Sequence, residues 1–126
     1  MTTVGVAVLH LFLGGGDAVA QEPATPIVRI AELEIEATQL EAFKAAVKKE
    51  METSVRVEPG VLAIYAVAEK EHPSKLRFFE MYADEAAFKA HIESPHFQKF
   101  RKETRDMVKS RKLIETVPVQ LSEKKK

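Results

Sequence analysis

The chain has 126 residues, of which 45% are hydrophobic, and its 19 basic and 19 acidic side chains give a formal net charge of zero. This length and composition suit one small domain with a single core, and the balanced charge lacks the long-range attraction to phosphate that a nucleic-acid partner requires. The absence of cysteine excludes disulfides, thiol catalysis, thiolate zinc sites and cysteine-bound iron–sulfur clusters.

The first twenty residues differ in composition from the rest of the chain. An apolar run from Val4 to Leu13 precedes the small residues Ala18 and Ala20, a combination typical of a signal peptide with an A-x-A cleavage site. The run is too short to be a stable membrane span. We therefore expect residues 1–20 to direct export, so that the protein is periplasmic or secreted, and residues 21–26 to be a linker. A disordered or membrane-associated leader is the alternative.

Beyond residue 26, hydrophobic periodicity predicts elements in the order β-α-β-β-α-β. Thr38 stands three residues before Glu41, which predicts a capping box for the first helix. The run Glu58-Pro59-Gly60 ends that helix. Ser94-Pro95 divides the second helical segment, because serine caps a helix and proline suits its first position. The expected strands are residues 27–35, 61–68, 76–82 and 113–121, and the expected helices are residues 39–56, a short one capped by Asp84, and one running from Pro95 to Val108.

This order of elements is that of the ferredoxin-like split βαβ fold, an α+β fold with a four-stranded antiparallel sheet and helices on one face. In the strands at 61–68 and 76–82, both the odd- and the even-numbered positions are apolar. A sheet with one solvent-exposed face instead alternates apolar and polar side chains along each strand. We therefore expect helices to cover one face and a second copy of the chain to cover the other. The prediction is a homodimer of a domain over residues 27–121 with a basic tail over residues 122–126.

Two histidines flank the predicted break in the second helical segment. The spacing between His91 and His96 is five, with a proline between them, whereas two metal ligands on one helix face stand three or four apart, so no metal is expected. His91 lies on an apolar face and is either a hydrogen-bonded core residue or a base. Glu80, among apolar neighbours, is either paired with Arg29 or Arg77 or has a raised pKa and a functional role.

The segment from Phe78 to Phe100, FFEMYADEAAFKAHIESPHFQKF, resembles the antibiotic biosynthesis monooxygenase (ABM) family, and in particular its small stand-alone members described as quinol monooxygenases. The family pattern has a glutamate, an aromatic residue two positions later, A-F/L-x-x-H, and S/T-P-H-F/M followed by another aromatic residue. The likeness extends over about residues 27–121. The matching positions are Glu80, Tyr82, Ala87-Phe88, His91, Ser94-Pro95-His96-Phe97 and Phe100, with Glu58-Pro59-Gly60 and Tyr65 upstream.

The resemblance implies a dimeric α+β barrel in which each subunit holds an apolar pocket between its sheet and its helices. It also implies oxidation of a small quinol or phenol by dioxygen with no cofactor, because a deprotonated electron-rich ring can itself give an electron to oxygen once the protein stabilises the anion. His91 or His96 is then the base, and Tyr82 is the third catalytic residue. The substrate-binding residues that the resemblance implies are Tyr65, Arg77, Glu80, Phe88, Phe97 and Phe100.

Two alternatives use the same residues without this reaction. The first is a non-catalytic dimeric module that holds an apolar ligand in the same pocket, and the second is a closed core in which both histidines are structural. Heme-degrading relatives carry a tryptophan and an axial histidine where this chain has His91 and Arg101, so heme is not expected.

Overall fold

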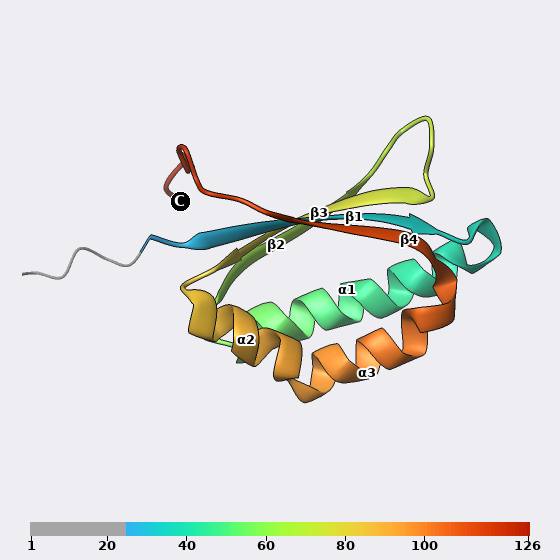
Figure 1. Cartoon of the computed structure of the whole chain (residues 1–126), viewed down its shortest axis with the longest axis horizontal. Coiled ribbons are helices and arrows are strands. Elements are labelled where there is room, and N and C mark those ends of the chain that lie inside the picture. The colour runs from blue at the N-terminus through green and yellow to red at the C-terminus, as the bar shows by residue number, and fades with distance from the viewer. Residues whose placement is uncertain (1–24) are drawn as a thin grey trace, which may run out of the picture.

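The computed structural model describes residues 25–126, and these residues form the predicted ferredoxin-like α+β fold (Figure 1). Figure 1 shows one twisted sheet with all of its labelled helices on the same face. The strands are antiparallel neighbours in the order β2-β3-β1-β4. The elements are β1 (Ile27–Ile35), a 3₁₀ turn (Ala37–Gln39), α1 (Leu40–Val57), β2 (Val61–Ala68), β3 (Lys75–Tyr82), α2 (Glu85–Glu93), α3 (Pro95–Thr104), a second 3₁₀ turn (Arg105–Met107) and β4 (Val108–Glu115).

Two expectations about the N-terminal part of the chain concern residues that lie wholly or mostly outside this range. The predicted signal peptide over residues 1–20 and most of the predicted linker over residues 21–26 lie outside the described residues. From residue 25 onward, no helix combines the length and the apolar character that crossing a bilayer requires.

The core lies between the helices and one face of the sheet. Pleating sends alternate side chains of a strand to opposite faces, and the pairing of β1 with β3 sets Ala31 beside Phe78 on the face that the helices cover. Phe43 and Val47 of α1 pack against this face, and the ring of Phe43 meets Phe100 of α3 with 5.8 Å between centroids. Each large apolar side chain buried here stabilises the fold by about 1.5–3 kcal/mol.

The start of the first helix differs from the predicted capping box. Residues Ala37–Gln39 form a 3₁₀ turn, and neither Glu36 nor Gln39 makes a side-chain capping hydrogen bond. Thr38 lies inside this turn and not at the cap position. The backbone itself closes the turn, since the N–H of Gln39 donates to the carbonyl of Glu36 at 2.8 Å, so the side-chain cap predicted at Thr38 is wrong.

The predicted break between the last two helices is confirmed. Asp84 caps α2 by accepting a hydrogen bond from the N–H of Ala87 at 2.8 Å. Ser94 accepts from the N–H of Phe97 at 3.3 Å and donates its hydroxyl to the carbonyl of His91 at 2.7 Å. Because the following proline disfavours helical backbone in the residue before it, Ser94 is extended, with φ −65° and ψ 147°. These caps fix both ends of α2.

The last strand begins earlier than the sequence predicts. Helix α3 ends at Thr104 and not at Val108, and β4 covers Val108–Glu115 in place of residues 113–121. Basic side chains interrupt the apolar pattern of β4 because this strand forms an edge of the sheet, where charge discourages pairing with another chain. Pro118 has no N–H to donate and lies beyond the strand.

The sheet face opposite the helices keeps large apolar side chains at the surface. Tyr65 and Val67 of β2 are 62% and 63% exposed, and Tyr65 lies beside Phe79 of β3, with 6.4 Å between ring centroids. The exposed apolar residues agree with the sequence pattern, in which both faces of these strands are apolar. The cover of this face by a second copy of the chain stays a prediction.

Candidate functional site

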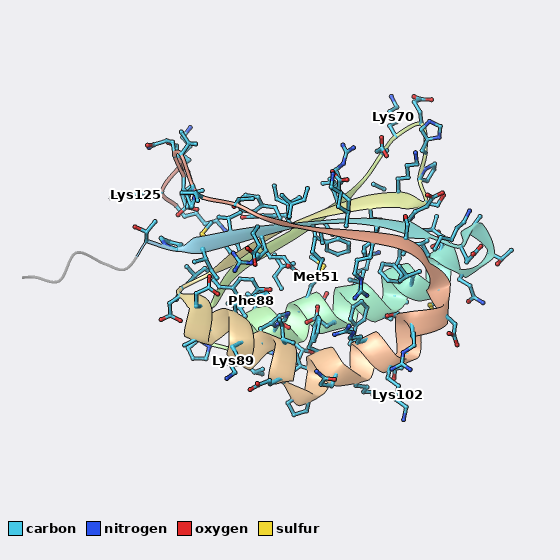
Figure 2. All side chains as sticks on the ribbon, viewed as in Figure 1. Met51, Lys70, Phe88, Lys89, Lys102 and Lys125 are labelled. Atoms are coloured by element: carbon cyan, nitrogen blue, oxygen red, sulfur yellow. The ribbon has the colours of Figure 1, made fainter. Side chains whose placement is uncertain are left out.

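An apolar cavity of about 150 Å³ lies between the sheet and the helices. An engineered apolar cavity of about this size takes up benzene, so one aromatic ring fits. In Figure 2, Phe88 lies between α2 and the sheet, whereas Lys89 and Lys102 point away from this layer into solvent. The aromatic lining consists of Phe78, Tyr82, Phe88, Phe97 and Phe100.

Two polar atoms in the cavity wall lack a hydrogen-bond partner among residues 25–126. They are the hydroxyl of Tyr82 and Nε2 of His91. Both side chains are almost fully buried, with exposures of 0% and 2%, and their ring centroids are 5.4 Å apart. A buried polar atom without a partner costs roughly 1–3 kcal/mol. The polar group of a ligand, or a water molecule before the ligand binds, is therefore stabilised at this point.

Glu58, at the end of α1, holds both histidines of the predicted site. Its Oε2 atom is 2.8 Å from Nδ1 of His91 and 2.7 Å from Nε2 of His96. Because a carboxylate accepts hydrogen bonds, these two ring nitrogens carry the protons, a tautomer assigned from the contacts. Neutral His91 then has the lone pair on Nε2, and the residue lines the cavity. His91 can act as a base there. His96 instead donates its Nε2 proton to Glu58 and does not line the cavity.

The charge of Glu58 follows from these contacts. Burial alone would raise the pKa of its carboxyl, but the hydrogen bonds and charges of His91 and His96 outweigh burial and lower the pKa below its usual value. Glu58 is consequently ionised at neutral pH. It stabilises the positive charge that appears on His91 when Nε2 takes up a proton.

Two further carboxyl groups, Glu80 of β3 and Glu50 of α1, line the same end of the cavity. Burial raises the pKa of Glu80, and the charge of Glu50 raises it further, against an opposing effect of His91. Glu50 accepts a hydrogen bond from the hydroxyl of Ser54 at 2.6 Å and lies 3.6 Å from Nε2 of His91. Burial, together with the charges of Glu80 and Glu50, also raises the pKa of Tyr82. Tyr82 therefore keeps its proton and can donate a hydrogen bond.

The structure brings most of the predicted site residues together but places two of them elsewhere. Tyr65 and Arg77 lie on the opposite face of the sheet, where Arg77 faces Glu32 across 3.7 Å. Successive side chains of a strand point to opposite faces of the sheet. Arg77 is three positions from Glu80, so it lies on the opposite face from Glu80. Neither Tyr65 nor Arg77 contacts a ligand in the cavity of its own chain. The predicted residues that do line the cavity are Tyr82, Glu80, Phe88, His91, Phe97 and Phe100.

Comparison with known proteins identifies the domain that carries this cavity. The family model described as antibiotic biosynthesis monooxygenase matches residues 26–103. The chain belongs to the antibiotic biosynthesis monooxygenase (ABM) family. The matched part of this ABM domain includes Glu58 and both histidines of the cluster, as well as Tyr82.

Solved structures resemble this ABM domain over most of the chain. A candidate antibiotic biosynthesis monooxygenase from Bacteroides thetaiotaomicron is 45% identical, with a TM-score of 0.78, and the match covers 83% of this chain and 100% of that one. A candidate monooxygenase from Lactobacillus acidophilus is 34% identical, with a TM-score of 0.73 and coverages of 75% and 45%. A candidate antibiotic biosynthesis monooxygenase from Nitrosomonas europaea is 25% identical, with a TM-score of 0.71 and coverages of 75% and 90%. None of the curated proteins matches the chain.

Two carboxylates of the ABM site are absent from the set predicted by sequence. Glu58 stands in the turn that ends the first helix, and nothing local indicates that its side chain reaches α2. Glu50 carries a clearer signal, since it follows Phe43 by seven residues and Val47 by three, which places a charged side chain on the buried face of its helix. A charged residue at such a position marks a candidate site.

The fold also supplies a set of metal-ligand atoms that the sequence spacing does not predict. Within the described part of the ABM domain, Glu50, His91 and His96 each offer a ligand atom, and these atoms lie within 4.8 Å of one another. A divalent ion bound by all three would compete with Glu58 for His96, whose Nε2 is 2.7 Å from that carboxylate. The hydrogen bond between Glu58 and His91 resembles the second bond that orients metal-bound histidines.

Proposed function

We propose that this protein is a monooxygenase that oxidises a small quinol or phenol with dioxygen and without a cofactor. Membership of the ABM family supports a monooxygenase at the level of the family. The observation that carries the finer proposal is the state of His91, which lines an aromatic cavity. Its Nδ1 is held by ionised Glu58, while its Nε2 has no hydrogen-bond partner in residues 25–126 and lies 3.6 Å from Glu50. The hydroxyl of Tyr82, also without a partner among the described residues, lies in the same wall.

The first step is removal of a proton from the substrate. A phenolic O–H donates to Nε2 of His91, which takes the proton as general base. Glu58 stabilises the resulting imidazolium, and the hydroxyl of Tyr82 donates a hydrogen bond to the phenolate oxygen. Both effects strengthen as charge develops, so they favour the anion over the bound neutral ring.

The phenolate then reacts with dioxygen. One electron passes from the ring to oxygen, and the two radicals combine to form a C–O bond in a peroxide. Return of the proton from His91 and loss of water break the O–O bond and leave a quinone. One phenol and one dioxygen give one quinone and one water, so the substrate supplies all the electrons.

Oxygen uptake with a panel of hydroquinones, phenols and naphthols tests this proposal. We expect turnover with at least one member and a fall in kcat/KM of about 10²–10⁴ in His91→Gln, because general-base catalysis contributes about this factor. The control is His72→Gln, at an exposed histidine of the β2–β3 hairpin, which should retain full turnover. Unchanged turnover in His91→Gln would overturn the assignment. Saturable binding without oxygen uptake by any member would favour the non-catalytic binding module.

We also propose that the protein works as a homodimer joined through the open face of the sheet. Exposed Tyr65 and Val67 support this interface, together with Phe79, whose ring centroid lies 6.4 Å from that of Tyr65. A contiguous apolar face of this kind is typical of protein–protein contact. The cavity lies on the other face of the sheet, between the strands and the helices.

A further inference from the structure

The cavity is open on the side of the sheet edge formed by β4. Leu113 pairs with Ala31 and therefore faces the helices, yet it is 69% exposed, so the helices leave this end of the sheet uncovered. Arg101 of α3 and Arg111 of β4 line the cavity at the same end. We call these two guanidinium groups the arginine pair.

The arginine pair differs from Arg29 and Arg77 in having no counter-ion among the described residues. Arg29 lies 2.9 Å from Glu85, and Arg77 on the opposite face lies 3.7 Å from Glu32. Within residues 25–126, neither Arg101 nor Arg111 has a carboxylate within 4.0 Å. The pair thus carries positive charge at the mouth of an apolar cavity with nothing in the described chain to neutralise it.

The two charges also act on each other. Burial lowers the pKa of Arg111, and the charge of Arg101 lowers it further. Both side chains are exposed, so water screens part of this repulsion, and an anion between the two guanidinium groups would relieve more of it. Each guanidinium presents a planar set of donors that matches a carboxylate with two parallel hydrogen bonds.

The arginine pair and the histidine end of the cavity are separated along the sheet. In the strand register, Glu80 pairs with Arg29 of β1, whereas Arg111 pairs with Leu33 of the same strand. Four residues of strand correspond to roughly 13 Å, and long side chains from both ends shorten the gap. A ligand that satisfies both ends therefore carries a hydroxyl at one end and an anionic group at the other.

We infer that the cavity binds aromatic acids, with the phenolic hydroxyl at Tyr82 and His91 and the carboxylate between Arg101 and Arg111. The identity of the ring rests on the proposed function, but the recognition of the carboxylate does not. Two lysines near this end, Lys99 and Lys102, line a surface depression together with Arg101 and add to the field that attracts anions.

Binding of matched acids and amides tests the inference without requiring turnover. Isothermal titration calorimetry under anaerobic conditions would compare hydroxyphenylacetate, hydroxyphenylpropionate and hydroxynaphthoate with their primary amides, which keep the shape and lose the charge. We expect at least one acid to bind about tenfold or more tightly than its amide, as for hydrogen bonds to charged groups. Arg101→Gln and Arg111→Gln should each remove most of this preference.

Arg105→Gln is the matched control, since Arg105 carries the same charge in the same region without lining the cavity. It should keep the preference for the acid. An equal loss in Arg105→Gln would indicate a diffuse surface field and would overturn the inference, as would the absence of any acid that binds more tightly than its amide. An acid that binds with the expected preference but consumes no oxygen would refute the monooxygenase proposal alone.

Discussion

At the residue scale, the central feature is one carboxylate oxygen shared by two histidines. The sequence leaves open whether His91 or His96 is the base, because both flank the same helix break. The contacts distinguish them, since His91 lines the cavity and its Nε2 has no hydrogen-bond partner in residues 25–126, whereas His96 does not line the cavity. His96 is therefore a positioning residue that helps to hold Glu58.

The lowered pKa of Glu58 predicts how its replacement changes stability with pH. A carboxyl whose pKa is lower in the folded than in the unfolded chain stabilises the fold above its unfolded pKa, here 4.5, and this contribution disappears as the pH falls through the folded pKa. Glu58→Gln should cost about 1–3 kcal/mol at neutral pH, with a smaller difference from the wild type at about pH 3. Urea unfolding at both pH values measures this.

Glu52→Gln is the control for this pH dependence. Glu52 is exposed on the same helix, so its replacement should change the free energy of unfolding little at either pH. A difference between wild type and Glu58→Gln that grows as the pH falls would contradict the assigned charge state.

At the element scale, the turn between α1 and β2 is packed against α2. A Cβ atom added at Gly60 would collide with the Cβ of Ala87, and the carbonyl of Gly60 accepts a hydrogen bond from Ala83 at 2.8 Å. No glycine in residues 25–126 has a positive φ, so close approach and not backbone conformation requires glycine here. This approach brings Glu58 within reach of His91.

Gly60→Ala should consequently destabilise the fold by about 1–3 kcal/mol through overpacking. In a double-mutant cycle, adding Ala87→Gly should relieve part of the loss, because it removes the atom that collides. Ala87→Gly alone should cost about 0.5–1 kcal/mol as a glycine inside a helix. Chemical denaturation of the four proteins measures the coupling. Additive losses would contradict a steric contact between these residues.

Element boundaries also show which signals are local. The break at Ser94-Pro95 is predicted correctly because capping and proline geometry act within a few residues. The start of β4 at Val108 is missed because an edge strand needs no alternation of apolar side chains. Thr38 has the sequence of a capping box, but the backbone forms a 3₁₀ turn there.

At the scale of the whole molecule, the open sheet face predicts the oligomeric state. We expect Val67→Glu to convert the proposed homodimer to a monomer, because it places charge in the middle of the proposed interface. The fold should be retained, since Val67 is exposed in the single chain. Light scattering at micromolar concentration measures the mass.

The matched control for the interface is Lys89→Glu. Lys89 points from α2 into solvent on the helix side of the sheet (Figure 2), and its replacement should leave the proposed dimer intact. A wild-type protein with the mass of a monomer, or a Val67→Glu variant that stays dimeric, would contradict this interface.

The sequence by itself determined the order of elements, the ferredoxin-like fold and the ABM family, because caps, turns, periodicity and a short motif are properties of neighbouring residues. It also predicted four of the five aromatic residues that line the cavity, together with Glu80 and His91. The tertiary structure alone decided which face Tyr65 and Arg77 occupy, since strands that are apolar at both parities give no sign of which face meets the helices. It alone paired Glu58 with His91 and His96, which lie 33 and 38 residues away, because such contacts depend on how distant elements pack and leave no local pattern.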